Sequence, residues 1–187
     1  MEIKEFFSNL FFTIAIGTSA VVAIIIYTYN LQRKIKVKLI QQRHLKMVAD
    51  LTGHHIVCGF GRAGDKIVRE LLAAGEKFII IDKEDKTKEC AGLNILFICG
   101  DPAKDEEILH QAQIKAAKSV FIMAGDDIDC AYITGNCRRL NPKIFIISRV
   151  GDNEDDKEIK KLGADIIIDP TVLGEVNKAR ELIKAAK

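Results

Sequence analysis

Six short apolar runs, separated by stretches of helical character, limit the fold of this chain more than any other feature. Each run is apolar throughout, which is typical of strands that are buried on both faces of a parallel sheet. Intervening helices then cover both faces, so we predict a doubly wound, Rossmann-like α/β fold with a parallel six-stranded sheet. The runs are HIVCG (55–59), KFIIID (77–82), NILFIC (94–99), SVFIMA (119–124), KIFIIS (143–148) and ADIIID (164–169). Helices are predicted at 62–74, about 84–92, 103–113, 127–140 and 153–162, with a last helix that opens at Pro170.

A glycine motif follows the first run. Gly59, Gly61 and Gly64 form the pattern G-x-G-x-x-G between a strand and a helix, the context that a dinucleotide-binding loop requires. Asp82 ends the second run, where a carboxylate accepts hydrogen bonds from ribose hydroxyls and repels a 2′-phosphate. Together they favour NAD or an adenosine nucleotide over NADP, although the neighbouring Lys83 weakens that discrimination. The alternative is a Rossmann fold with an empty crevice.

The third run ends in Gly100, Asp101 and Pro102, beside the expected crevice. An Asp before a Pro is common where a turn leads into a helix, so a turn with a helix cap is the simpler interpretation. Contact between this backbone and a bound adenine is the second interpretation.

The N-terminal region has a different character. Residues 10–29 carry no charge, and about 20 such residues cross a bilayer as a helix. We therefore predict a transmembrane helix within 1–29, with a cleaved signal peptide as the competing interpretation. A basic helical linker is predicted at 30–52. Because basic residues flank membrane spans on the cytoplasmic side, we expect the domain at 53–187 to lie in the cytoplasm, after a single pass through the cell membrane. Gly17 within the span permits either close helix packing or a hinge.

Composition disfavours several other classes of protein. The net charge of +2 is too small to indicate a nucleic-acid partner. The five cysteines include no C-x-x-C pair and the four histidines have no metal-ligand spacing, so we expect reduced thiols and no bound metal.

Six stretches of the domain together resemble the RCK or KTN domain (TrkA-N type), which regulates potassium channels and Trk- and Ktr-type potassium uptake systems. They are GFGRAG, IIIDKE, GDPAKDEEIL, SVFIMAGDDID, IISRVGD and KKLGADIIIDP. The resemblance implies a site for NAD(H) or an adenine nucleotide (ATP, ADP or AMP). Its implied residues are Gly59, Phe60, Gly61, Arg62, Ala63, Gly64, Asp82, Lys83, Gly100, Asp101, Asp126 and Arg149.

Two positions depart from patterns within that family. Calcium-gated relatives carry carboxylates after the fifth strand, where this chain has Arg149. Because a hard cation needs several oxygen ligands, nucleotide control is favoured over calcium control at that site. The family often has Asn where this chain has Cys130, so a ligand contact there is not implied.

The sequence TIAIGTSAVVAIIIY, followed by the basic linker, resembles the inner helix of a two-helix potassium channel, with its hinge at Gly17. No filter motif of the T-V-G-Y-G type is present, so we expect an RCK N-lobe without a C-lobe and without a pore of its own. The implied protein is a nucleotide-sensing subunit or domain of a ligand-gated potassium channel. It would act as a homo-oligomer, a dimer or a higher ring, and its partner would be a pore-forming subunit.

Two alternatives remain open. One is the regulatory subunit of a Trk or Ktr uptake system, which would need no membrane helix. The other is a membrane-anchored NAD-dependent oxidoreductase. It is disfavoured because the sheet leaves no room for a catalytic domain, and because His54, His55 and His110 are not placed to act as a general base.

Overall fold

The computed structural model describes residues 26–32, 35, 47–48, 50–93, 95–151, 156–169 and 178–186. The chain divides into two compact units, Met1–Leu45 and Lys46–Lys187. In the first unit residues 26–32 are helical, and the rest of the membrane span predicted within 1–29 lies outside the described residues. Within the described ranges, no helix is both long and apolar enough to cross a bilayer. The membrane helix therefore stays a prediction.

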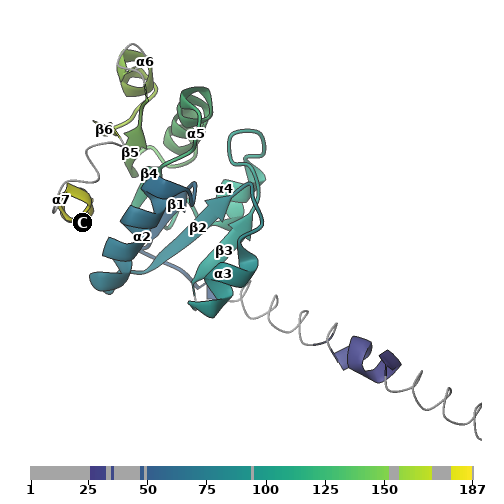
Figure 1. Cartoon of the computed structure of the whole chain (residues 1–187). Coiled ribbons are helices and arrows are strands. Elements are labelled where there is room, and N and C mark those ends of the chain that lie inside the picture. The colour runs from purple at the N-terminus through teal and green to yellow at the C-terminus, as the bar shows by residue number, and fades with distance from the viewer. Residues whose placement is uncertain are drawn as a thin grey trace, which may run out of the picture. The chain divides into compact units, whose positions relative to one another are not determined.

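A single six-stranded parallel sheet forms the second unit, with the strand order β3-β2-β1-β4-β5-β6 (Figure 1). This confirms the predicted doubly wound, Rossmann-like fold. The order reverses between β1 and β4, which opens a crevice at the carboxyl ends of the strands. The strands are β1 (His55–Cys58), β2 (Phe78–Asp82), β3 (Leu96–Cys99), β4 (Ser119–Ile122), β5 (Phe145–Arg149) and β6 (Ile166–Ile168). The helices are α2 (Arg62–Ala73), α3 (Thr87–Gly92), α4 (Glu107–Gln111), α5 (Asp127–Leu140), α6 (Asp156–Lys161) and α7 (Lys178–Ala185).

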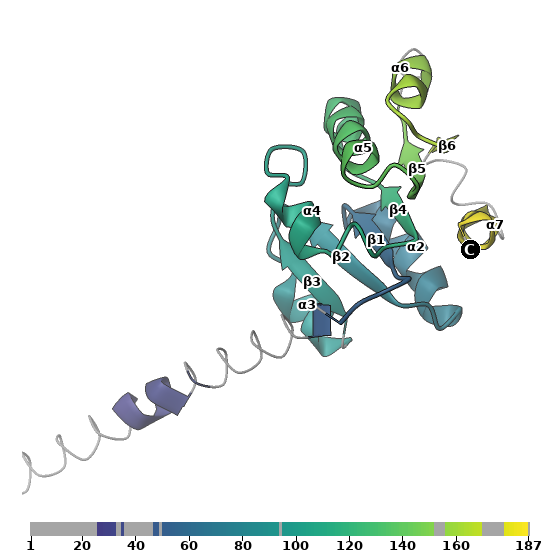
Figure 2. The same ribbon diagram turned by 180° about the vertical axis from the view of Figure 1, so that it is seen from behind.

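Apolar side chains of each strand pack in two core clusters, one on each face of the sheet. In β1, Ile56 and Cys58 pack on the face that carries α4, α5 and α6, whereas Val57 packs on the face that carries α2, α3 and α7 (Figure 2). Fully burying an Ile or Val side chain contributes about 1.5–3 kcal/mol, so a strand that is apolar on both faces gains from both clusters. This is why the runs are continuous instead of alternating.

Two of the predicted helices are shorter than the sequence indicated. The helix predicted at about 84–92 begins at Thr87. The helix predicted at 103–113 is limited to α4, Glu107–Gln111. In both cases an Asp two residues before the helix accepts a hydrogen bond from the first helical N–H. Asp85 Oδ1 accepts from Thr87 N and Asp105 Oδ1 accepts from Glu107 N, each at 3.0 Å. These turns fix the helix starts, because Asp bonds its own backbone two residues on.

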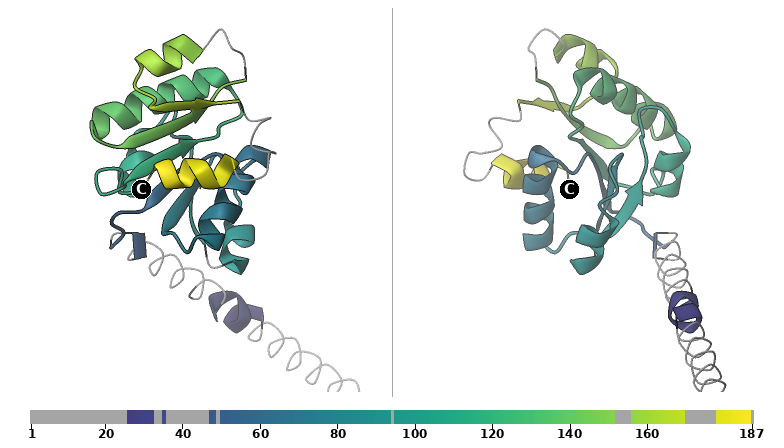
Figure 3. Two further views of the ribbon diagram at one scale, coloured as in Figure 1. Left: turned by 90° about the vertical axis from the view of Figure 1, so that its left-hand side faces the viewer. Right: turned by 45° about the vertical axis from the view of Figure 1, so that its right-hand side comes forward.

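The last helix lies beside α2 (Figure 3). In α7, Ala179, Leu182 and Ile183 are buried in the same cluster as Leu71 of α2. The guanidinium of Arg180 pairs with Glu70 at 3.2 Å. Thus α7 covers the sheet of its own chain. Residues 170–177, including the predicted helix start at Pro170, lie outside the described residues.

A buried polar cluster closes the amino edge of the sheet. His55, the first residue of β1, is fully buried, and its Nδ1 lies 2.6 Å from Ser119 Oγ. Its Nε2 lies 3.4 Å from Glu76 Oε2, which also accepts a hydrogen bond from Lys118 Nζ at 2.7 Å. Burial, together with the positive charge of Lys118, lowers the pKa of His55 to about 4, although Glu76 opposes the shift. The ring is therefore neutral at pH 7.

This lowered pKa predicts acid sensitivity. The unfolded chain takes up a proton on His55 below about pH 6.5, whereas the folded chain takes it up only near pH 4. The free energy of unfolding should therefore fall by about 2–3 kcal/mol as the pH drops from 7 to 4.5. Urea denaturation at several pH values measures this. In His55→Gln the fall should be clearly smaller, and an identical pH dependence in the variant would contradict the assignment.

Candidate functional site

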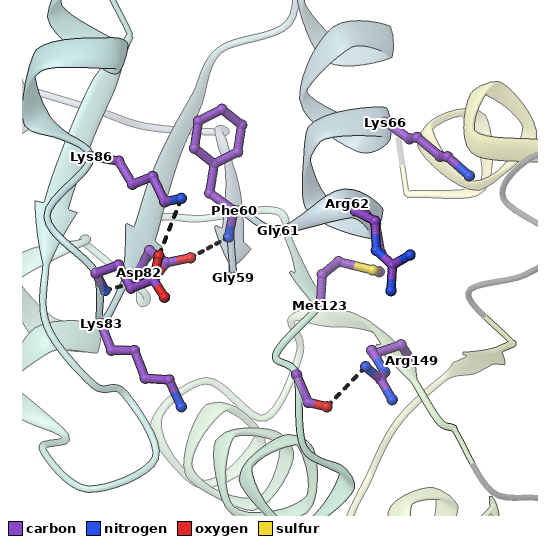
Figure 4. A pocket seen from close by; sticks show the side chains of 13 residues that line it. Gly59, Phe60, Gly61, Arg62, Lys66, Asp82, Lys83, Lys86, Met123 and Arg149 are labelled. Carbon is purple, nitrogen blue, oxygen red and sulfur yellow. Dashed lines mark hydrogen bonds and ion pairs between the residues drawn. The ribbon is translucent and has the colours of Figure 1, made fainter.

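A cavity of about 560 Å³ lies at the carboxyl edge of the sheet, where the strand order reverses (Figure 4). It is the crevice in which open α/β sheets bind ligands. Most of the residues predicted for the site meet there. Its lining consists of Gly59, Phe60, Gly61, Arg62, Ala63, Lys66, Asp82, Lys83, Glu84, Lys86, Met123, Gly125 and Arg149.

The glycine loop is set by two close backbone approaches. Gly59 has φ +100°, and a Cβ added to it would lie 2.5 Å from the Met123 carbonyl oxygen. A Cβ on Gly64 would lie 1.9 Å from the carbonyl oxygen of Gly59. Gly61 differs, since a Cβ there would meet nothing within 4 Å in the described structure. Gly59 and Gly64 are therefore required by the fold, whereas Gly61 leaves open space for a ligand.

Asp82 is held in place by backbone N–H groups. Phe60 N donates to its Oδ2 at 2.5 Å, and Glu84 N donates to its Oδ1 at 2.8 Å. The first bond ties the carboxylate to the glycine loop, so the two halves of the sequence fingerprint touch each other. Each carboxylate oxygen keeps a further acceptor position, which suits it to bind a pair of hydroxyl groups.

Charged side chains divide the crevice into two sides, which Figure 4 displays. The β2 side carries two acids and two bases, among them Glu84 and Lys86, which pair at 3.2 Å. The β5 side carries Arg62, Lys66 and Arg149. Arg62 and Lys66 both project from the start of α2, because residues four apart share a helix face. The charges on the β2 side therefore balance, whereas the lining residues of the β5 side are all positively charged or uncharged.

Arg149 is fixed at the end of β5. Its Nη2 donates to Asp127 Oδ1 at 2.9 Å, and its Nη1 donates to the carbonyl oxygen of Gly125 at 3.2 Å. Asp127 Oδ2 in turn accepts from Gly151 N at 2.8 Å. The remaining Nε is buried and has no hydrogen-bond partner among the described residues. Asp127 therefore holds the guanidinium of Arg149 at the crevice, and the Nε–H of Arg149 lacks an acceptor.

Four residues predicted for the site lie outside the main lining. Gly64 is buried at the start of α2, and Gly100 faces Ile108, whose Cδ1 would lie 2.5 Å from an added Cβ. Asp126 is the N-cap of α5 and accepts from Ile128 N at 2.7 Å. Asp101 lines a small adjoining cavity of about 60 Å³. Its pKa is lowered because hydrogen bonds from Lys104 and the Ala103 N–H outweigh the opposing effect of burial.

Cys130 does not reach the crevice. It is fully buried in the core, and its Sγ donates weakly to the Ala124 carbonyl oxygen at 3.8 Å. Burial raises the pKa of its thiol to about 12. All five cysteines are free, and the described residues hold no group of three His, Cys, Asp or Glu side chains that could bind a metal.

Sequence reasoning missed five lining residues: Lys66, Glu84, Lys86, Met123 and Gly125. Lys66 had a usable signal, since it follows Arg62 by one helical turn. Met123 and Gly125 come from the end of β4, so only the strand order brings them to the loop.

Comparison with family models identifies the family of the domain. Residues 55–170 match the model of the TrkA-N domain. The chain belongs to the TrkA-N domain family. The match covers β1 to β6, and so includes the glycine loop, Asp82 and Arg149.

Two of the relatives of this TrkA-N domain are named as potassium channel or potassium uptake proteins. Potassium channel protein 1 of Methanocaldococcus jannaschii is 31% identical over 142 residues, which are 74% of this chain and 42% of that protein. The TrkA homolog of the Trk potassium uptake system of Pyrococcus abyssi is 32% identical over 123 residues, 62% of this chain and 53% of that protein. An uncharacterised protein of Methanothermus fervidus is 38% identical over 132 residues, 69% of this chain and 21% of that protein. The chain thus spans at most about half the length of these relatives.

Solved structures share the fold. The TrkA-N domain of the inner membrane protein ybaL of Escherichia coli superposes with a TM-score of 0.62 at 24% identity, over 74% of this chain and 99% of that domain. The GsuK channel superposes with a TM-score of 0.55 at 21% identity, over 64% of this chain, in structures bound to NAD and to ADP. These alignments cover 22% and 32% of the respective channel chains.

The glycine geometry predicts opposite outcomes for two equivalent substitutions. Gly64→Ala forces a methyl group against the Gly59 carbonyl, so we expect it to lower the free energy of unfolding by about 1–3 kcal/mol or more. Gly61 has a φ of −87°, which alanine also adopts, and a Cβ at this position would have open space around it. The melting temperature of Gly61→Ala should therefore stay near that of the wild type. Thermal and urea denaturation of both variants measures this, and equal stability would contradict the close approach.

Proposed function

We propose that this TrkA-N domain binds NAD(H) or an adenine nucleotide in the crevice and thereby regulates potassium transport. The observation that carries the proposal is the bond between Phe60 N and Asp82, which places a ribose acceptor directly beside the open glycine loop. The free N–H groups at the start of α2 favour phosphate at that loop. Relatives named as potassium channel and potassium uptake proteins, and a channel solved with NAD and with ADP, support the same role.

Within potassium transport, the proposed system is a ligand-gated channel. The supporting features are the apolar span predicted within 1–29 and the basic linker predicted at 30–52, which would join the domain at 53–187 to a pore at the cell membrane. Ligand binding changes such an equilibrium only through its differential affinity for two arrangements, typically about 1–3 kcal/mol. A role in a Trk or Ktr uptake system is the second candidate, supported by the Pyrococcus relative.

The lining of the crevice favours a sensor over an oxidoreductase. Hydride transfer usually requires an acid or base beside the nicotinamide. The groups of the described lining that could act as an acid or a base are carboxylates and lysines, of which Asp82 is bonded to the Phe60 N–H and Glu84 is paired with Lys86. The buried His55 lies at the opposite edge of the sheet, where it bonds to Ser119.

A matched pair of carboxylate substitutions tests nucleotide binding. Asp82→Asn removes the charge next to the glycine loop, and Glu84→Gln removes the neighbouring charge of the same crevice. Hydrogen bonds to charged groups contribute about 1.5–3 kcal/mol, so Asp82→Asn should weaken binding about tenfold or more. Glu84→Gln should change it much less. Calorimetry of the full chain with NAD, NADH, ATP, ADP and AMP measures both, and saturable binding that is equal in the two variants would reject the assigned role of Asp82.

Oligomerisation through this domain is also part of the proposal. A groove of about 350 Å³ runs between α5 and α6. Three large apolar residues stand exposed along it: Ile128 at 65%, Tyr132 at 63% and Leu162 at 42%. Contiguous exposed apolar side chains of this kind mark protein–protein contacts. We therefore place the contact between copies of the chain on this groove.

Tyr132→Asp should shift the chain toward monomers, because it puts a charge into the centre of the proposed contact. Leu72→Asp is the matched control, since Leu72 is 47% exposed on α2, away from the groove. Size-exclusion chromatography with light scattering of the full chain distinguishes them. A wild-type monomer, or equal dissociation in both variants, would contradict the placement.

A further inference from the structure

Positive charge and exposed apolar side chains meet at the amino edge of the sheet, at the opposite end of the strands from the crevice. We propose that this edge is a docking surface for anionic lipid headgroups, and that Lys77, Lys115 and Lys143 form its basic part. It is a second binding surface of the domain, and lipid bound there requires no nucleotide in the crevice.

Lysines follow one another along this edge. Lys77 directly precedes β2 and Lys118 directly precedes β4, with β1 between these two strands. His55 N donates to the Lys77 carbonyl oxygen at 2.9 Å, and Phe145 N, at the start of β5, donates to the Lys118 carbonyl oxygen at 3.2 Å. Lys143 lies two residues before Phe145. Because neighbouring strands are about 4.8 Å apart, the row from β2 to β5 spans about 14 Å.

Lys115 belongs to the same edge, beside the point where the chain enters the domain. It precedes Ala116, whose carbonyl oxygen accepts a hydrogen bond from Gly53 N at 2.8 Å. The linker predicted at 30–52, which leads to this point in the sequence, is also basic. Positive charge therefore occurs in the chain on both sides of the entry point.

Two other cations of the edge are occupied by ion pairs within the domain. Lys118 Nζ pairs with Glu76 at 2.7 Å. Arg138 pairs with Asp165 at 2.8 Å and also donates to the carbonyl oxygen of Gly163, before β6. These pairs neutralise one another and add nothing to the net charge of the surface.

The three proposed lysines are not neutralised in this way. Lys77, Lys115 and Lys143 are exposed, and none of them has a carboxylate within 4.0 Å among the described residues. In the described segments that precede the strands, Asp50 is the one acid outside the two ion pairs. The edge thus presents three positive charges against one negative charge. Their spacing is comparable to a Debye length of about 8–10 Å, so their potentials add.

Exposed apolar side chains accompany the lysines. The second unit has six large exposed apolar residues among those described, and three of them line the groove between α5 and α6. The other three are Met47, Leu72 and Leu93. Met47 lies in the entering segment, Leu72 in the last turn of α2, and Leu93 at the end of α3. Helices that connect parallel strands run back to the amino edge, so all three lie toward this edge.

This combination favours a lipid surface over other anionic partners. Lysine amines bind the phosphate groups of an anionic leaflet, while neighbouring apolar side chains enter the boundary of the acyl chains. Nucleic acid would be met by cations, and it gives exposed leucines nothing to bury against. The chain also reaches this edge from residues 10–29, an uncharged stretch of bilayer length.

Docking at the amino edge is compatible with ligand binding in the crevice. The cavity opens at the carboxyl ends of the strands, and its lining includes none of the residues of the basic surface. A domain held on lipid by its amino edge therefore keeps the crevice accessible from the aqueous side.

Acetylation of lysine amines, followed by mass spectrometry, tests the surface residue by residue. The full chain is combined with vesicles of phosphatidylcholine alone, or of an equal mixture of phosphatidylcholine and phosphatidylglycerol. Contact with an anionic surface keeps a lysine amine in its protonated, unreactive form. Acetylation of Lys77, Lys115 and Lys143 should therefore slow about three- to sevenfold with the mixed vesicles only. High salt should restore the rate. The internal control is a set of exposed lysines distant from this edge, whose rates should not change: Lys88, Lys104 and Lys157.

Two matched triple variants test whether the lysines cause the contact. One variant combines Lys77→Gln, Lys115→Gln and Lys143→Gln. The control combines the same change at the three internal-control lysines. Lys118 is present in both and serves as the reporter, since it lies on the amino edge and is partly exposed. Its slowing by mixed vesicles should be lost in the first variant and kept in the control, and both variants should melt near the temperature of the wild type.

Several outcomes would overturn the proposal. Equal slowing with both kinds of vesicle, or equal slowing of the internal-control lysines, shows that anionic lipid does not select the amino edge. Slowing confined to the linker lysines, such as Lys34 and Lys38, shows that the linker binds lipid without the domain. A lower melting temperature in the first variant only, with the slowing of Lys118 kept, assigns the lysines to stabilising the helix C-termini at this edge. No slowing with mixed vesicles rejects lipid and leaves an acidic protein surface as the partner.

Discussion

The contact between the glycine loop and the end of β4 is the constraint on which the site depends. The Gly59 carbonyl lies where a side chain of residue 64 would be, and the Met123 carbonyl lies where a side chain of residue 59 would be. Backbone therefore meets backbone at the point where β1, β4 and α2 converge. This close packing presents the first turn of α2 to the crevice and holds Met123 at its floor. Any side chain larger than hydrogen would separate these elements.

The polar groups at the amino edge of the sheet and those at its carboxyl edge have different surroundings. At the amino edge, His55 and Ser119 are buried and bonded to each other, and water has no access to them. At the carboxyl edge, the polar groups line an open cavity, which gives a ligand access to them. Both edges hold buried nitrogens without a hydrogen-bond partner among the described residues: Nδ1 of His54 and Nε2 of His55 at the amino edge, and Nε of Arg149 at the carboxyl edge. The edges therefore differ in the access that the cavity provides, and not in how completely their polar groups are bonded.

The fold could be predicted from the sequence because its strands are apolar on both faces. This pattern is visible in the sequence of each strand alone, without knowledge of which strands are its neighbours. The starts of α3 and α4 could not, because they depend on the bonds of Asp85 and Asp105, which compete with helix formation. The glycine loop and Asp82 were predictable since their roles follow from a short motif with fixed spacing.

The remainder of the site depends on contacts across the sheet. Met123 reaches the loop only because β4 lies next to β1. The pairing of Arg149 with Asp127 joins the end of β5 to the start of α5, and no local pattern indicates it. The resemblance to a family predicts that Arg149 lies near the ligand, but the orientation imposed by Asp127 depends on the folded structure.

The position of β1 has a mechanical consequence for any protein that carries this domain. The chain enters the domain at the amino edge, where Gly53 N bonds to the Ala116 carbonyl at 2.8 Å, and the crevice lies at the far end of β1. Four residues of extended strand separate the two, roughly 13 Å of rigid, hydrogen-bonded sheet. Packed interiors have low compressibility and transmit strain, so a strand of this kind moves as a rigid element. A displacement of the glycine loop at one end of β1 is therefore passed to the amino edge, where the chain enters the domain.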